Sequence, residues 1–156
     1  MASKIFKEKI CLVFATLFGV GYTPLMPGTA ACLVALGVFF VIKDPISFLV
    51  FTLITVIISF PISSYAEKIY KVKDCKKIVI DDFSGMLVAL LAIPKKIEFI
   101  LPAFFLFRAF DILKVPPADK IEKKRGGIGI VGDDLIAGAY TFIIFQLVKL
   151  ALNIFS

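Results

Sequence analysis

The stretch from residue 46 to residue 64, ISFLVFTLITVIISFPISS, decides the fold class. Its 19 residues carry no charge, and about 20 apolar residues in a helix cross the hydrocarbon core of a bilayer. In lipid, backbone amides are satisfied only in helices or closed barrels. The run shows no alternation of apolar and polar residues that would favour a barrel strand. We therefore predict a membrane-crossing helix over residues 46–64.

The composition of the whole chain agrees with this prediction. Of the 156 residues, 60% are hydrophobic, and the mean hydropathy is +0.97. Soluble domains are about 45–50% apolar, and a small domain cannot bury such an excess. The composition thus argues against an ordinary soluble domain and excludes a disordered chain. We expect a single membrane-embedded domain over residues 1–156.

Four further apolar stretches extend the pattern. A basic start is followed by residues 10–22, which resemble a signal peptide but lack a small-residue cleavage site, so we expect this segment to be retained. Residues 29–42 form a short apolar run. Residues 78–113 are interrupted at 94–96 and predict a helical hairpin, and residues 135–155 predict a final helix. The expected fold is all-α, a polytopic bundle with short or re-entrant helices.

The distribution of lysine and arginine predicts the orientation. With the N-terminus inside, 14 of the 18 basic residues fall on the cytoplasmic face, as the positive-inside rule requires. The remaining four are Lys43, Lys95, Lys96 and Lys149. We therefore predict a multi-pass protein of a bacterial cytoplasmic membrane. The net charge of +6 is then topological, and no nucleic-acid partner is expected.

The residue inventory restricts the chemistry. The chain has no histidine, which excludes Ser-His-Asp triads and histidine-ligated zinc. Cys11, Cys32 and Cys75 are far apart, with no CxxC spacing, so neither a zinc ribbon nor a redox pair is expected. Any catalysis must depend mainly on carboxylates.

Three groups of aspartates reach the cytoplasmic face in the predicted topology. They are Asp81-Asp82, Asp111 and Asp133-Asp134. Adjacent carboxylates beside apolar sequence are costly unless a cation compensates them, and all-oxygen ligands favour Mg²⁺. The alternative is that each pair caps a helix, with Asp82 capping a helix that starts at Phe83. We predict an active site that binds a metal ion and faces the cytoplasm.

Basic residues and glycines near the aspartates suit a phosphate. On a helix, Arg108, Asp111 and Lys114 share one face, so that the two cations can neutralise a phosphate while Asp111 binds the metal. A structural ion-pair ladder is the alternative. Glycines 126, 127 and 129 allow backbone amides to approach an anion, or simply form a flexible turn. The breaker-rich segment 19–29 predicts either the wall of a cavity or a loop before a helix, with Thr29 near its cap.

Four blocks of sequence, taken together, resemble the phosphatidylglycerophosphatase A family. They are GVGYTPLMPGTA, IVIDDFSG, FLFRAFDILK and GGIGIVGDDLIAG. Their order matches that of the family blocks, and they cover nearly the whole chain. The resemblance implies a helical, Mg²⁺-dependent membrane enzyme that hydrolyses phosphatidylglycerophosphate to phosphatidylglycerol and phosphate.

The resemblance also implies roles for individual residues. The metal ligands would be Asp81, Asp82, Asp111, Asp133 and Asp134. Of these, Asp81, Asp82, Asp111 and Asp134 would be catalytic. Substrate phosphate would be bound by Arg108, Lys114, Thr29, Gly126, Gly127 and Gly129. The chain departs from the family pattern at Asp82, where glutamate is usual, at Ala31-Cys32, where the family has glycine and serine, and at Val115-Pro116, which follows Lys114 where the family has a proline first.

Two other functions fit parts of the pattern. A different Mg²⁺-dependent phospholipid phosphotransferase would also use intramembrane aspartates, although its usual motif arrangement is absent. A small cation-binding carrier would place charges near the middle of the bilayer, whereas these aspartates gather at one face. Membrane lipids are expected partners in every case, and the sequence makes no prediction of the oligomeric state.

Overall fold

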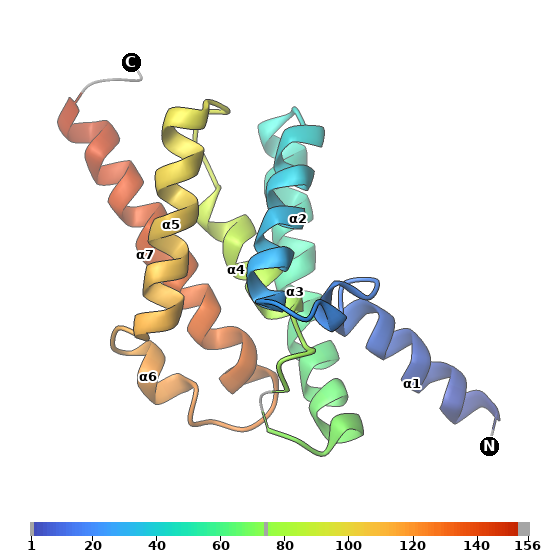
Figure 1. Cartoon of the computed structure of the whole chain (residues 1–156). Coiled ribbons are helices and arrows are strands. Elements are labelled where there is room, and N and C mark those ends of the chain that lie inside the picture. Colours follow the sequence, from blue (N-terminus) through green and yellow to red (C-terminus); the bar gives the residue numbers. More distant parts are fainter. Residues whose placement is uncertain (1, 74, 153–156) are drawn as a thin grey trace.

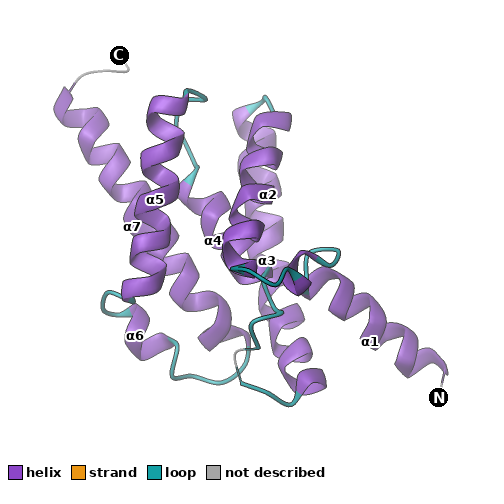
Figure 2. Cartoon of the chain, viewed as in Figure 1, coloured by secondary structure: helices purple, strands orange, loops and turns teal. Residues whose placement is uncertain are grey.

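The computed structural model describes residues 2–73 and 75–152, and within these ranges it contains helices and no strand (Figures 1 and 2). In chain order the elements are α1 (Ala2–Ala15), the 3-10 turn η1 (Val20–Tyr22), α2 (Pro27–Val41), α3 (Pro45–Tyr70), α4 (Ile80–Ala89), α5 (Ile97–Leu113), α6 (Ala118–Ile121) and α7 (Gly127–Leu152). The all-α prediction is confirmed for this part of the chain.

Two helices are long and apolar enough to cross a membrane. They comprise Pro45–Tyr70 and Gly127–Ala151, so the helices predicted at 46–64 and 135–155 are present, although residues 153–155 lie outside the described residues. The predicted break at 94–96 separates α4 from α5. With 10 residues, α4 is only about 15 Å long, which is too short to cross a bilayer. The full number of crossings stays a prediction.

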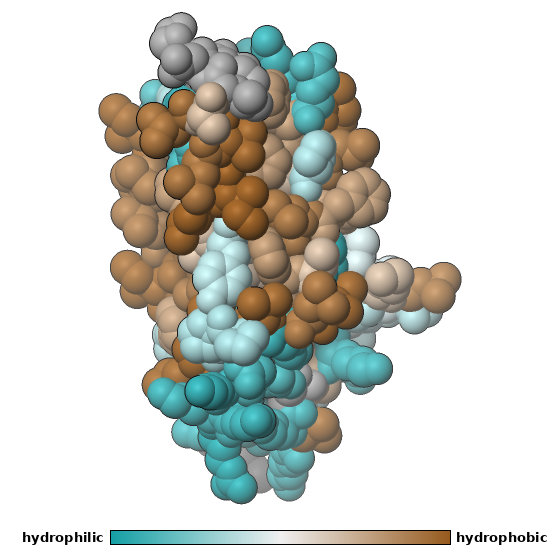
Figure 3. All heavy atoms as spheres, turned by 90° about the vertical axis from the view of Figure 1, so that its left-hand side faces the viewer, coloured by the Kyte–Doolittle hydropathy of each residue, from teal (hydrophilic) through white to brown (hydrophobic). Residues whose placement is uncertain are grey.

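The outer surface of the bundle is apolar over much of its length. Large exposed side chains include Ile57 on α3, Phe105 on α5 and Leu150 on α7, each more than 60% exposed. In Figure 3, apolar atoms cover most of the face formed by α5 and α7, and hydrophilic atoms gather at its lower end. Such a continuous apolar surface, together with two span-length helices, indicates a membrane protein.

The short helix α4 occupies the centre of the bundle. It packs against α7 and α2 (Figure 1), and the core includes its fully buried Met86 and Leu87 together with Phe107 of α5. Gly85 and Gly138 allow α4 and α7 to approach closely, since a Cβ on Gly138 would collide with the Gly85 carbonyl. This packing fixes the first turn of α4, which carries Asp81 and Asp82.

The start of α7 differs from the prediction. The helix begins at Gly127, eight residues before the expected start at residue 135. The apolar run marks only the portion that could face lipid, whereas the preceding turns are buried against protein: Gly127 lies against the backbone of Phe60, and Val131 is fully buried. As a result, Asp133 and Asp134 lie within the helix and not before it.

Candidate active site

All five predicted aspartates line one cavity of about 530 Å³. Arg108 and Lys114 line it as well. The carboxylates come from α4, α5 and α7, so residues far apart in sequence meet as predicted. The grouping of Asp81, Asp82, Asp111, Asp133, Asp134, Arg108 and Lys114 is therefore a property of the fold.

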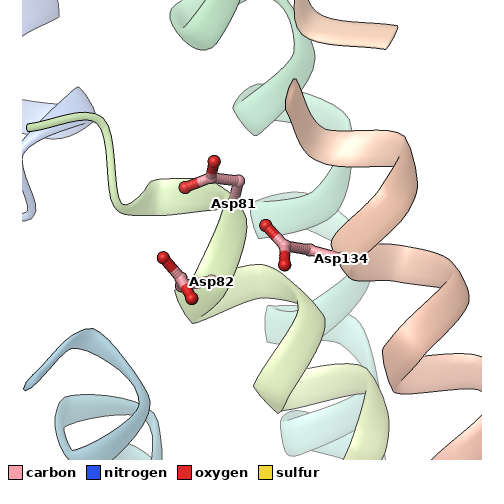
Figure 4. Close-up of side chains that lie close together, drawn as sticks. All are labelled: Asp81, Asp82 and Asp134. Atoms are coloured by element: carbon pink, nitrogen blue, oxygen red, sulfur yellow. The ribbon is translucent and has the colours of Figure 1, made fainter. Parts of the chain in front are cut away.

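Three of the aspartates form a compact cluster. One carboxylate oxygen each from Asp81, Asp82 and Asp134 can be chosen so that all three lie within 4.8 Å of one another. Figure 4 shows Asp81 and Asp82 leaving consecutive positions of α4, with Asp134 reaching toward them from α7. Asp81 and Asp134 are buried, each about 5% exposed. Like charges this close repel one another, and the repulsion is relieved by protonation or by a nearby cation.

The helix-cap alternative does not account for the carboxylates. Helix α4 begins at Ile80, and its N-cap is Val79, which makes no side-chain cap hydrogen bond. Asp82 therefore does not cap a helix starting at Phe83. Asp134 lies seven residues into α7, well beyond any capping position. The acidic residues of α4 do lie in its first turn, where the helix dipole favours negative charge.

Arg108 links two of the carboxylates. Its guanidinium donates to Asp82 across the interface between α4 and α5, and its Nη1 lies 2.6 Å from Asp111 Oδ2 on its own helix. The predicted shared face of Arg108 and Asp111 is thus confirmed. A half-buried guanidinium held by two carboxylates is already oriented toward the cavity, where it can also meet a phosphate oxygen.

Lys114 is positioned differently from the prediction. Helix α5 ends at Leu113, and Lys114 adopts a left-handed conformation with φ 48°, so it does not continue the face of Arg108 and Asp111. Its ammonium instead binds Asp133 at 3.0 Å and Glu122 at 2.8 Å. Burial lowers the pKa of Lys114, but the hydrogen bonds and charges of Glu122 and Asp133 outweigh it, and the net pKa is raised.

The breaker-rich segment before α2 forms one wall of the cavity, as predicted. Pro24, Met26, Pro27 and Gly28 line it, and a Cβ on Gly28 would lie 2.6 Å from the Asp82 carboxylate carbon. Only glycine leaves room for the carboxylate here. Thr29 follows within α2; it is not among the lining residues, and its buried Oγ1 has no hydrogen-bond partner among the described residues.

The predicted phosphate-binding glycines lie apart from the aspartates. The amide of Gly126 donates to Glu67 at 2.9 Å, and the amide of Gly127 donates to Ser64 at 2.6 Å. Neither glycine lines the aspartate cavity, and neither does Gly129. The structure therefore does not bring these glycines to the carboxylates. Their phosphate role stays a prediction.

Two charged residues of the site were missed in the sequence. Lys76 lines the cavity, and Glu122 binds Lys114. Lys76 lies in a lysine-rich segment that the charge pattern explains as topological, and Glu122 lies within a basic run. Neither position carries a signal that separates it from its neighbours.

The donor set fits a hard divalent cation. The cluster of Asp81, Asp82 and Asp134 offers only carboxylate oxygens, the ligand type that Mg²⁺ selects. The Oδ1 atom of Asp134 is buried and has no hydrogen-bond partner among the described residues. A buried carboxylate oxygen without a donor is energetically costly, and a bound cation would remove that cost.

Comparison with known proteins shows the family of the chain. Residues 13–149 match the family phosphatidylglycerophosphatase A. The chain belongs to this family. Members of the phosphatidylglycerophosphatase A family are phosphoric monoester hydrolases, so the chain is an enzyme of that class. No solved structure matches it.

Three curated relatives cover most of the chain. Phosphatidylglycerophosphatase A of Haemophilus influenzae is 35% identical over 137 residues, covering 85% of this chain and 84% of the relative. The Escherichia coli protein of the same name is 30% identical, covering 81% and 76%. A Bacteroides thetaiotaomicron protein, provisionally named as a phosphatidylinositol-3-phosphatase, is 32% identical, covering 88% and 92%.

Proposed function

We propose that this protein hydrolyses phosphatidylglycerophosphate to phosphatidylglycerol and phosphate, with Mg²⁺ as cofactor, at the cytoplasmic face of a bacterial membrane. The observation that carries the proposal is the single cavity in which three clustered aspartates lie beside Arg108 and Lys114. Carboxylates suit the cation, and guanidinium and ammonium groups suit the phosphate. Family membership supports the choice of substrate.

Within this proposal, Asp81, Asp82 and Asp134 hold the cation. Mg²⁺ bound there would polarise the phosphoryl group and make water a better nucleophile. Arg108 binds a phosphoryl oxygen while its contacts with Asp82 and Asp111 fix the guanidinium. Lys114, anchored by Glu122 and Asp133, supplies a second positive charge.

Hydrolysis also requires a proton acceptor. Water attacks phosphorus and gives up a proton, the bond from phosphorus to the glycerol oxygen breaks, and that oxygen takes up one proton, so the number of protons is conserved. Since the chain has no histidine, a carboxylate must accept the proton of the water. Asp111 lines the cavity but lies outside the three-oxygen cluster, so it is the proposed acceptor.

The location of the cavity relative to the charge pattern supports a cytoplasmic active site. The cavity opens beside Lys76 and Lys114, both on the lysine-rich side of the predicted topology. A lipid substrate in the inner leaflet would present its phosphate at this level. A cysteine introduced at exposed Lys76, in a chain whose three native cysteines are replaced by serine, tests the orientation. It should react with a membrane-impermeant thiol reagent in inverted vesicles, which expose the cytoplasmic face, and not in vesicles of the native orientation.

A second substrate deserves a direct comparison. The Bacteroides relative bears the name of an inositol-lipid 3-phosphatase, and that lipid is also a phosphomonoester in a membrane. Both substrates would use the same cation and phosphate contacts, but one has a linear glycerol headgroup and the other a ring.

The experiment is a phosphate-release assay on the purified protein in mixed micelles. We expect kcat/KM for phosphatidylglycerophosphate to exceed that for phosphatidylinositol 3-phosphate, with EDTA stopping both reactions and Mg²⁺ restoring them. A preference for the inositol lipid would replace the proposed substrate while keeping the site. No phosphate release from either lipid would contradict the proposed function.

A further inference from the structure

A second cavity, at the end of the bundle away from the aspartates, collects lysines that the topology does not explain. Lys43, Lys95 and Lys149 all line this cavity of about 680 Å³. Its lining comes from the connection between α2 and α3, the turn from α4 to α5 and the end of α7. These segments lie at the same end of the bundle in Figure 1. In the predicted topology, only Lys96 joins these three on the non-cytoplasmic face.

The walls of the second cavity are mainly apolar and aromatic. Phe39 and Phe48 are buried and pack edge to face, with ring centroids 5.1 Å apart. Phe142 of α7 and the exposed Leu49 of α3 extend this lining. The cavity therefore combines a hydrocarbon-like surface with ammonium groups from three separate parts of the chain.

The charged residues that line the second cavity are the three lysines. Among the described residues that line it, there is no aspartate or glutamate. Asp44, next to Lys43 in the chain, points its carboxylate at the amide and hydroxyl of Ser47, both at 2.7 Å, and so caps α3. Lys95 donates to the Ile42 carbonyl and lies 5.0 Å from the Phe39 ring centroid, which holds its ammonium beside the aromatic wall.

We propose that this second cavity binds an anionic phospholipid of the leaflet opposite the active site. The phosphate would lie against the three lysine ammoniums, and an acyl chain would lie along the wall of Phe39, Phe48 and Phe142. Basic pockets between membrane helices bind anionic headgroups through charge, and lysine binds phosphate as a point charge. A zwitterionic lipid carries no net negative charge, so it would be attracted less strongly to the three ammonium groups.

Lipid binding to the purified protein tests this proposal. The protein is titrated with phosphatidylglycerol, or with phosphatidylethanolamine, in EDTA, and bound lipid is counted by native mass spectrometry. We expect phosphatidylglycerol to bind at least about tenfold more tightly than phosphatidylethanolamine. The double variant Lys43→Gln with Lys149→Gln should bind the two lipids equally. The pair Lys43→Arg with Lys149→Arg should retain the preference for phosphatidylglycerol.

A matched control removes the same charge from the other face. The pair Lys68→Gln with Lys71→Gln should keep the phosphatidylglycerol preference, and the Lys43 and Lys149 glutamine pair should keep phosphatase activity, which shows that it folds. The proposal would be overturned if the wild-type protein bound both lipids equally, or if both glutamine pairs lost the preference for phosphatidylglycerol to the same extent. Displacement of the bound lipid by inorganic phosphate would also overturn it. So would a dimer that the Lys43 and Lys149 pair disrupts, since a second copy would then occupy the cavity.

Discussion

Arg108 of α5 and Asp82 of α4 form an ion pair across the interface between two helices of the active-site cavity. The same guanidinium binds Asp111, so one side chain neutralises a member of the three-aspartate cluster and the proposed proton acceptor. Removing it would leave two half-buried carboxylates in mutual repulsion.

Replacing Arg108 should therefore impair both binding and turnover. We expect Arg108→Gln to lower kcat/KM by on the order of 100-fold, comparable to the loss of one transition-state donor. Arg108→Lys should recover only part of this, because an ammonium cannot reproduce the planar fork of a guanidinium. Steady-state kinetics measure the effect, with the exposed Arg125→Gln as control. Wild-type kcat/KM in Arg108→Gln would exclude a phosphate role for Arg108.

Gly28 is expected to be essential because of its contact with Asp82. An added Cβ would collide with the Asp82 carboxylate, so Gly28→Ala should displace the carboxylate and reduce kcat by at least about tenfold. Gly37 lies on the same helix with nothing within 4 Å of an added Cβ. Gly37→Ala should leave activity intact and stabilise the helix by about 0.4–1 kcal/mol. Equal activity in the two variants would mean that the segment around Gly28 can move away from Asp82 without loss of activity.

The stability of the contact between α4 and α7 should depend on the size of the side chains at their crossing. Gly138→Ala places a Cβ against the Gly85 carbonyl, and we expect a cost of about 1–3 kcal/mol from overpacking. Thermal unfolding in detergent measures it, again with Gly37→Ala for comparison. An unchanged unfolding temperature in Gly138→Ala would show that α4 and α7 can move slightly apart without loss of stability.

The contribution of Lys114 to stability should persist into alkaline solution. Its pKa is raised in the folded protein, so its ion pairs stabilise fully below the unfolded pKa of about 10.4 and are lost only as the pH rises through the folded value. The difference in unfolding temperature between wild type and Lys114→Gln should therefore stay constant from about pH 7 to about pH 10. Exposed Lys120→Gln is the control. A difference that shrinks between neutral pH and about pH 9 would contradict the ion-pair assignment.

The sequence predicted that the aspartates meet because these residues are chemically conspicuous. Paired carboxylates beside apolar runs are costly in a membrane protein, so Asp81-Asp82 and Asp133-Asp134 stand out without any structure. The helix break at 94–96 was also predictable, because a proline and two lysines lie there between apolar runs.

Features fixed by close packing were not predictable from the sequence. The start of α7 at Gly127 depends on contact with the backbone of Phe60, which no local pattern records. The reversal of the backbone at Lys114 turned its ammonium toward Asp133 and Glu122, whereas helical spacing placed it beside Asp111. The capping of the Gly126 and Gly127 amides by Glu67 and Ser64 likewise joins segments that are far apart in the chain.

We infer that Asp134, with Asp81 and Asp82, holds a divalent cation, while the adjacent Asp133 binds Lys114. Titration with Mn²⁺, followed by electron paramagnetic resonance in place of the silent Mg²⁺, tests it without relying on turnover. Wild type and Asp133→Asn should both bind the ion, and Asp134→Asn should bind it at least about tenfold more weakly. Equal affinity in Asp134→Asn and wild type, or no binding by wild type, would contradict the account.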